Sequence, residues 1–214
     1  IDEMWTNGRI VETPHHCTSL GVLNRMKEDS VNYIAQNIDV TPFYHKYKVL
    51  LQITKNSDST KTYVTTFPGY IGANGLNQNI GVSVNSLMDL ESTLDGLPVC
   101  CVVRGVLCKQ NFIEAEEFLR KIKHASGQNY IIGSREDISS FECSASKVST
   151  FWPDSTHLYT FHANNTLSND SYNPFYLSYL TDSLNTTHKE FIKESPRLEA
   201  IENRILGNNS IDLK

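Results

Sequence analysis

Short runs of β-branched and aromatic residues, separated by polar turn segments, recur along most of this chain of 214 residues. Residues 48–53 and 61–67 are two such runs, and the polar segment 56–59 between them predicts a β-hairpin. Residues 80–85 alternate between apolar and polar side chains, which is typical of a strand with one buried face. Sheets are therefore expected to form much of the fold.

Further strands are expected from the same kind of pattern along the rest of the chain. The run 99–107 is almost continuously apolar and follows Pro98, so we interpret it as a central strand. The other predicted strands lie near 130–132, 141–146 and 158–163.

Two segments have the signals of amphipathic helices. Asn111 is a preferred N-cap residue with Glu114 three positions later, as in a capping box, and apolar residues follow at helical spacing. Ser195 and Pro196 predict the start of a last helix, which Gly207 would end. The apolar face of this helix consists of Leu198, Ile201 and Ile205. Many strands and few helices predict an α+β fold in which helices cover sheets.

Composition excludes several classes of function. The net charge is −5 and the basic residues are scattered, so a nucleic-acid partner is not expected. The chain has no apolar run of about 18 residues, which predicts no membrane-spanning helix, and no signal peptide is visible. The five cysteines are odd in number and contain no CxxC pair, which argues against a zinc site or a disulfide framework. We therefore expect no metal and a reducing, cytoplasmic location.

Cys17 is the residue that says most about function. Thr18 and Ser19 follow it, and the strand-like segment 35–39 ends in an acid, Asp39. A thiolate is the nucleophilic form of cysteine, and it needs a nearby base or positive charge. Cys17 is therefore a candidate nucleophile, and inert packing in an apolar strand is the alternative.

The preceding His15 and His16 suggest either a metal site or a Cys/His dyad with Cys17. Adjacent residues in a strand point to opposite faces, so the two histidines cannot both face the thiol. We give this interpretation little weight.

Six short motifs, taken in order, resemble one known family. They are Cys-Thr-Ser at 17–19, Ala-Gln-Asn-Ile-Asp at 35–39, an Asn-x-x-x-Gly segment leading to Asn85, a Pro-led segment with Arg at 98–104, His-Ala-Asn-Asn at 162–165 and Ser-Pro-Arg at 195–197. This order is similar to that of the N-terminal-nucleophile (Ntn) cysteine hydrolases of the acyl-CoA:6-aminopenicillanate acyltransferase type, which are related to choloylglycine hydrolases and penicillin V acylases.

The resemblance implies a fold and a processing step. The fold would be the four-layer αββα Ntn-hydrolase sandwich, without its C-terminal strands. Residues 1–16 would be the tail of a pro-segment and 17–214 the hydrolase domain. The Cys17 thiol would attack the carbonyl of the His16–Cys17 bond, and cleavage would free an α-amino group with an ordinary pKa of roughly 8 that can act as general base. The uncleaved chain would be a zymogen.

The resemblance also implies roles for four further residues. Asp39 would orient the amine of the nucleophile. Asn164 would donate a hydrogen bond to the oxyanion, and Asn85 would help through its backbone or side chain. Arg197 would hold an active-site or substrate carboxylate through a bidentate pair.

The expected function is that of an autoprocessed acyltransferase or amidohydrolase (amidase). An acyl group from a small-molecule linear amide or thioester would reside on Cys17 and pass to an amine or to water, with no cofactor. Three positions depart from the family pattern: His16, Ala35 and Asn165. Ala35 and Asn165, together with the expected lack of the C-terminal strands, motivate the alternative of an inactive relative that serves as a binding module or partner subunit. A papain-like protease is a distant option, and a homo-oligomer is left open.

Overall fold

The structure is a computed structural model, and it describes residues 16–23, 32–39, 46–153, 158–193 and 195–206. Its described strands form two antiparallel sheets. The smaller sheet has the order β10-β1-β2, with β1 (His16–Val22) between β2 (Tyr33–Asp39) and β10 (Tyr159–His162).

The larger sheet has seven strands in the order of the sequence, β3 to β9. They are β3 (Val49–Thr54), β4 (Lys61–Thr66), β5 (Asn74–Leu76), β6 (Gly81–Ser86), β7 (Gln128–Gly133), β8 (Ile138–Cys143) and β9 (Val148–Phe151). The predicted hairpin is confirmed by the pairing of β3 with β4, and the predicted strands at 80–85, 130–132 and 158–163 are confirmed by β6, β7 and β10.

The strand expected at 141–146 lies three residues earlier than predicted. β8 ends at Cys143, because the chain turns directly after it: the Ser144 nitrogen donates to the Lys147 carbonyl at 2.8 Å. The turn leads into β9, which the sequence analysis did not predict.

Residues 99–107 form a helix, α2 (Val99–Val106), so the prediction of a central strand was wrong. A continuous apolar run fits a buried helix as well as a buried strand. The pre-helical Pro98 opens the helix, since its carbonyl accepts from the nitrogens of Cys101 and Val102 at 2.9 and 3.0 Å. The residues that α2 buries are spaced as one helical face: Val99, Val102, Val103 and Val106.

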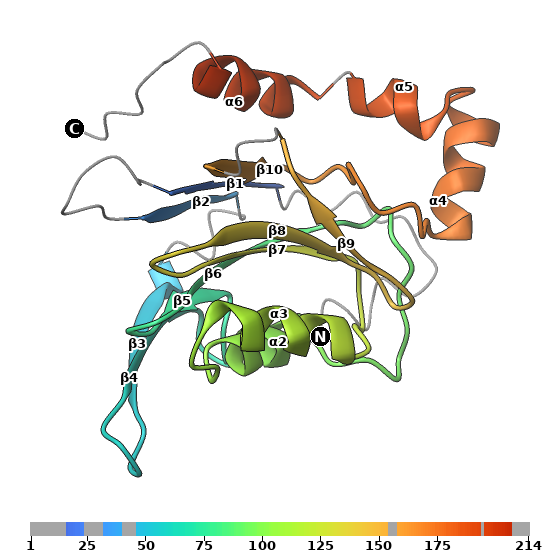
Figure 1. The fold of residues 1–214 in the computed structure, drawn as a ribbon. Coiled ribbons are helices and arrows are strands. Elements are labelled where there is room, and N and C mark those ends of the chain that lie inside the picture. Colours follow the sequence, from blue (N-terminus) through green and yellow to red (C-terminus); the bar gives the residue numbers. More distant parts are fainter. Residues whose placement is uncertain (1–15, 24–31, 40–45, 154–157, 194, 207–214) are drawn as a thin grey trace.

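The second helix, α3 (Phe112–Lys121), begins as predicted. Asn111 accepts from the Glu114 nitrogen at 2.9 Å, and the Glu114 carboxylate accepts from the Gln110 nitrogen at 3.0 Å. Helices α2 and α3 lie together against one face of the seven-stranded sheet (Figure 1). The main apolar core fills this interface and includes Val82, Tyr130, Ile132, Phe141 and Cys143 from the sheet.

The three-stranded sheet lies on the other face of the larger sheet (Figure 1). A much smaller apolar cluster joins the two sheets, formed by Leu23, Ile131 and Ile138 with Ile34 packed against it. A Cβ at Gly21 would collide with the Ile138 side chain, so the missing side chain lets β1 approach the larger sheet.

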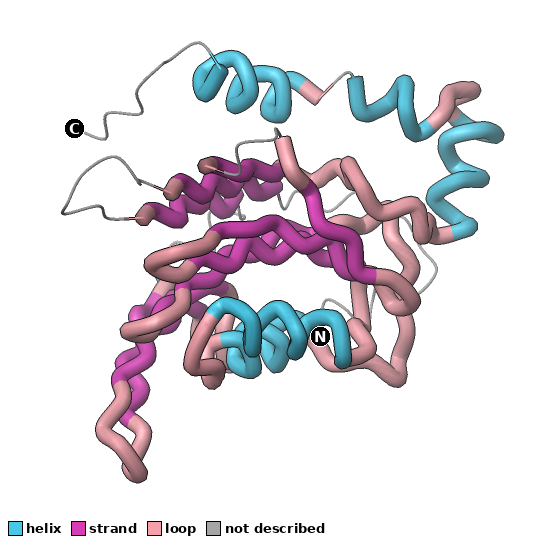
Figure 2. Tube along the Cα trace, in the orientation of Figure 1, coloured by secondary structure: helices cyan, strands magenta, loops and turns pink. Residues whose placement is uncertain are grey.

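The C-terminal part of the described chain is helical and runs along the outer side of the three-stranded sheet (Figure 2). It consists of α4 (Pro174–Ser178), a π-helical turn (Tyr179–Ser183), α5 (His188–Lys193) and α6 (Pro196–Leu206). Only α6 was predicted. It begins at Pro196 as expected, and Ile205 is buried, while the predicted stop at Gly207 lies outside the described residues.

The packing of helices on antiparallel sheets confirms the predicted α+β class. Residues 163–173 connect β10 to α4, and loop 167–173 is the second part of this connection. Within the described ranges, no helix combines the length and the apolarity needed to cross a membrane.

Candidate active site

Cys17 lies in β1, the central strand of the smaller sheet, opposite Ile38 of β2. Burial alternates along β1: Cys17 and Ser19 are buried, and Thr18 and Leu20 are half-buried. Gly21 belongs to the same alternation and faces Ile138 of the larger sheet. The Cys17 side chain therefore points between the two sheets, where 9% of the residue is exposed.

Asn164 holds the backbone of Cys17. It follows β10, and its Oδ1 accepts from the Cys17 nitrogen at 2.7 Å. Its Nδ2 donates to the Ser86 carbonyl at the end of β6, at 2.9 Å. One amide thus bridges the two sheets at the candidate nucleophile. The donor that the resemblance assigns to an oxyanion is bonded to Ser86 in this structure.

Arg197 reaches the same place from the first turn of α6. Its Nη1 donates to the Cys17 carbonyl at 2.8 Å, and both Nη1 and Nη2 lie 3.1 Å from Oδ1 of Asn164. Two nitrogens of the guanidinium thus donate to one oxygen, which belongs to an amide, whereas the expectation was a bidentate pair with a carboxylate. Cys17, Asn164 and Arg197 are brought together from residues up to 180 positions apart.

Asn85 and Asp39 are the two other residues expected at the site. Asn85 of β6 is fully buried, and its Nδ2 is 3.5 Å from the His162 carbonyl. Its Oδ1 has no hydrogen-bond partner among the described residues. Asp39 ends β2 and accepts from Asn37 at 2.7 Å. The contact to the Cys17 nitrogen that the resemblance assigns to Asp39 is made by Asn164 here.

Burial raises the pKa of the Cys17 thiol above its ordinary value, and the negative charge of Asp39 raises it further. The positive charge of Arg197 and a hydrogen bond from the Gln36 side chain act in the opposite direction and are outweighed. Cys17 is therefore a neutral thiol at neutral pH, and it needs a base to become a nucleophile.

Gln36 is a site residue that the sequence analysis did not single out, although it lies within the motif at 35–39. Its side chain donates to the Val84 carbonyl, accepts from Asn74 at 2.9 Å and lowers the pKa of the Cys17 thiol. It also lines a groove of about 870 Å³ between β2 and strands β4 to β6. The groove has apolar walls, which include Tyr33, Ile34, Leu50 and Tyr63, and several amide side chains.

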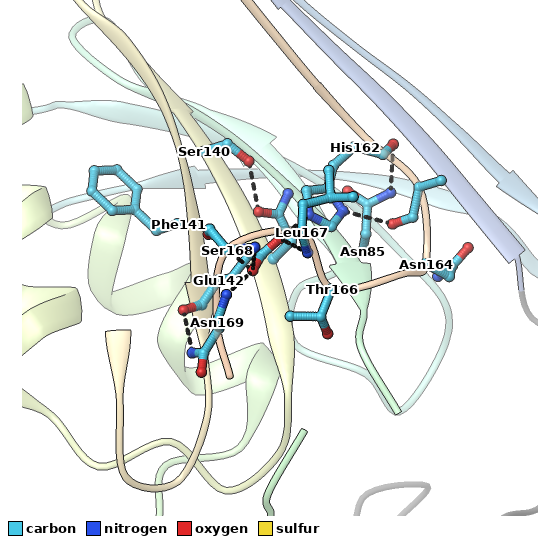
Figure 3. Close-up of polar contacts among 12 residues, drawn as sticks. Asn85, Ser140, Phe141, Glu142, His162, Asn164, Thr166, Leu167, Ser168 and Asn169 are labelled. Atoms are coloured by element: carbon cyan, nitrogen blue, oxygen red, sulfur yellow. Dashed lines mark hydrogen bonds and ion pairs between the residues drawn. The ribbon is translucent and has the colours of Figure 1, made fainter. Parts of the chain in front are cut away.

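A second group missed from the sequence is a buried pair, Glu142 of β8 and His162 of β10 (Figure 3). The two side chains are 0% exposed, and Nε2 of His162 lies 2.7 Å from Oε1 of Glu142. Burial alone would raise the pKa of Glu142, but His162 and the backbone N–H groups of Leu167 and Ser168 outweigh burial and lower it. Two signals were available: His162 is the first residue of the motif at 162–165, and Glu142 is an acid inside a predicted strand.

The described residues contain no group of three His, Cys, Asp or Glu placed to hold a metal ion. The suggested histidine site falls on His15 and on the side chain of His16, which lie outside what the structure describes. The described cysteines, all five of the chain, are unbridged.

A comparison with known protein families matches residues 25–206 to the family described as acyl-coenzyme A:6-aminopenicillanic acid acyl-transferase. The matched range includes Asp39, Asn85, Asn164 and Arg197, and it begins after Cys17. No curated protein matches the chain significantly. Because the family match extends over well more than half of the chain, the chain belongs to this acyltransferase family.

Proposed function

We propose that this chain is an autoprocessed cysteine acyltransferase or amidohydrolase of the Ntn type, and that it works through an acyl group carried on Cys17. The two sheets, with α2 and α3 on one side and α4 to α6 on the other, would be the four layers of the αββα sandwich. Family membership supports the acyltransferase class. The site geometry supports the choice of nucleophile.

In the processing step, the Cys17 thiol attacks the carbonyl carbon of residue 16. The C–N bond to Cys17 breaks, its electron pair goes to the nitrogen, the nitrogen takes up the proton that the thiol has lost, and the pro-segment is left as a thioester on Cys17. Water then hydrolyses the thioester and returns the thiol. The products are residues 1–16 with a carboxylate end and a chain that begins with the free amine of Cys17.

The main observation behind the proposal is that the backbone nitrogen and the backbone carbonyl of Cys17 both make hydrogen bonds to site residues. Asn164 accepts from its nitrogen at 2.7 Å, and Arg197 donates to its carbonyl at 2.8 Å. After cleavage the same acceptor would keep the amine beside its own thiol. The nearby guanidinium would favour the uncharged amine, which is the form that can accept the proton of the thiol.

Asn85 is the better placed of the two candidate oxyanion donors. Its Nδ2 makes only a long 3.5 Å contact, whereas the Nδ2 of Asn164 is bonded to Ser86 at 2.9 Å. Loss of one oxyanion donor typically costs on the order of 3 kcal/mol of transition-state stabilisation. We therefore assign the donor role to Asn85 and the amine-holding role to Asn164.

The groove beside Gln36 would bind a small-molecule amide or acyl thioester. Its apolar side chains suit an acyl chain, and its amide side chains suit the polar group next to the scissile bond. Cys17 is not among the residues that line the groove, but Gln36 lines it and its side chain lowers the pKa of the Cys17 thiol, which supports placing the reacting end of the substrate at Gln36.

The test is the reactivity of Cys17 towards a thiol-directed acylating probe at neutral pH, measured by peptide mass spectrometry in the wild-type chain and in Cys17→Ala. The matched control is Cys108→Ala, which removes an exposed cysteine. We expect rapid labelling at residue 17 in the wild type and in the control. A Cys17 that labels no faster than the buried Cys143 would contradict the proposal and favour an inactive relative.

A further inference from the structure

The segment between β10 and loop 167–173 carries Asn164, and Glu142 lies at both of its ends (Figure 3). In front of Asn164, the carboxylate bonds to His162. Behind it, the same carboxylate accepts from the backbone nitrogens of Leu167, Ser168 and Asn169 at 2.7, 2.8 and 2.7 Å. We propose that Glu142 and His162 are positioning residues, which bracket residues 163–166 and so hold Asn164 on the Cys17 nitrogen.

The hydrogen-bond partners of His162 hold its ring on both sides. Its Nδ1 lies 2.9 Å from the Ala163 carbonyl, and its Nε2 lies 2.7 Å from the Glu142 carboxylate. Both ring nitrogens therefore face an oxygen atom of a neighbouring group. The Glu142 and His162 side chains are 0% exposed, so breaking these contacts would leave buried polar atoms without partners, which is costly.

The bracket connects directly to the candidate nucleophile. His162 pairs with Ser19 in the sheet, two residues from Cys17 on the same strand and face. Two residues beyond His162, Asn164 bonds the Cys17 nitrogen and the Ser86 carbonyl. A shift of the bracketed segment would move the acceptor of the Cys17 nitrogen, while Cys17 itself would stay in β1.

A second carboxylate supports the middle of the segment. Asp89 accepts from the Thr166 nitrogen at 3.0 Å, and His188 of α5 lies 3.1 Å from the Thr166 carbonyl. The segment is therefore fastened to the larger sheet through Glu142 and to the helices through His188. This second support leaves the segment attached when the bracket is weakened, so substitutions in the bracket can be read as changes of position.

The first experiment measures hydrogen exchange in a Cys17→Ala background, in which no cleavage can occur. Glu142→Gln and His162→Gln are compared with the control His124→Gln, a buried histidine remote from the site whose Nε2 lies 2.9 Å from the Leu119 carbonyl. We expect the amide of residue 17 to exchange at least tenfold faster in both bracket variants and unchanged in the control. Faster exchange at 167–169 with an unchanged amide at residue 17 would overturn the proposal.

The second experiment places the same substitutions in the chain with Cys17 and follows cleavage by intact mass. This arm rests on the proposed function, and we expect cleavage at least tenfold slower in Glu142→Gln and His162→Gln than in His124→Gln. Cleavage at the control rate would overturn the positioning role. A wild-type chain that is never cleaved would count against the proposed function alone, because the exchange result does not depend on cleavage.

If Glu142→Gln does not fold, Ser168→Ala gives a milder variant. It removes only the 3.0 Å bond from the Ser168 hydroxyl to the carboxylate and leaves the backbone bonds in place. We expect a smaller rise in exchange at residue 17, in the same direction. No change at residue 17 in either His162→Gln or Ser168→Ala would overturn the proposal.

Discussion

The two faces of the seven-stranded sheet are built from alternate residues of the same strands, and they differ in kind. Val82, Tyr130, Ile132, Phe141 and Cys143 face α2 and α3 and form the main apolar core. Their neighbours face the smaller sheet and are mostly polar: Ser83, Asn85, Asn129, Ser140 and Glu142. One face forms the main apolar core, and the other carries residues of the candidate site.

The two faces therefore contribute differently to the free energy of folding. The helix side removes apolar surface from water, which is the dominant stabilising term in folding. The side between the sheets buries polar atoms, some of them without a hydrogen-bond partner among the described residues, such as Ser19 Oγ, Ser83 Oγ and Asn85 Oδ1. Buried polar groups of this kind reduce stability and are typical of sites that need them for function.

The largest expected effect is on the helix side. Phe141→Ala removes a ring that is 1% exposed, and we expect it to lower the free energy of unfolding by about 3–5 kcal/mol. Its neighbour Ser140 faces the other sheet and donates to Asn129 at 2.6 Å, so Ser140→Ala should cost only about 1 kcal/mol. Urea denaturation of both variants measures the contrast, and equal losses would contradict the division between the faces.

The second largest effect is expected on the rate of cleavage, with little change in the free energy of unfolding. Arg197→Lys replaces a fork that reaches the Cys17 carbonyl and Asn164 with a single ammonium group. Losing one charge-assisted hydrogen bond of about 1.5–3 kcal/mol should slow cleavage before residue 17 by about ten- to hundredfold. The time course of intact mass measures the rate. An unchanged rate would remove Arg197 from the site.

A smaller effect is expected in the way the free energy of unfolding changes with pH. The pKa of Glu142 lies below its ordinary value in the folded chain, so the stability it contributes is complete above about pH 4.5 and is lost as pH falls through the lowered pKa. One group gives a slope of at most about 1.4 kcal/mol per pH unit. We expect wild type to lose stability below pH 4.5 more steeply than Glu142→Gln.

Asp89 is the other deeply buried acid near this pair, and burial raises its pKa. The contribution of Asp89 to the pH dependence of stability therefore has the opposite sign. This contribution is the same in wild type and in Glu142→Gln, so it cancels when the two proteins are compared. Urea denaturation at several pH values between 3 and 6 measures the difference. Parallel curves for the two proteins would show that Glu142 is not ionised in the folded chain.

The smallest effect is expected at the surface. Cys108 is exposed after α2, so Cys108→Ala should change the free energy of unfolding by less than about 0.5 kcal/mol and leave cleavage unchanged. Urea denaturation measures the change in stability, and the time course of intact mass measures cleavage. A loss of cleavage in this variant would mean that Cys17 is not the thiol responsible.

Much of the fold could be predicted because local patterns decide it. The β3–β4 hairpin, the cap at Asn111 and the start of α6 at Pro196 rest on residues close in sequence. The apolar run at 99–107 was assigned wrongly because Cys100 and Cys101 are apolar although they lie outside the buried face of α2, so the sequence shows a continuous apolar run in place of a helical period. The helices at 174–193 depend on contacts such as that of His188 with the distant Thr166.

Several residues of the candidate site could be predicted from the sequence, but the contacts that they make could not. Cys17, Asn164 and Arg197 were expected together, and they lie together. Asn164, and not Asp39, contacts the Cys17 nitrogen. The strand register explains the difference, because it places Asp39 opposite His16, whereas Asn164 lies beside Cys17. Glu142 could not be assigned, because its partners come from β10 and loop 167–173 and appear only after the two sheets are stacked.

The most direct test of the account is N-terminal sequencing with intact-mass measurement of the purified chain, expressed with residues 1–16 in place. The account predicts a mature chain that begins at Cys17 and has lost the mass of residues 1–16, and a Cys17→Ala chain that keeps it. An active wild-type chain that retains residues 1–16 would contradict the central claim.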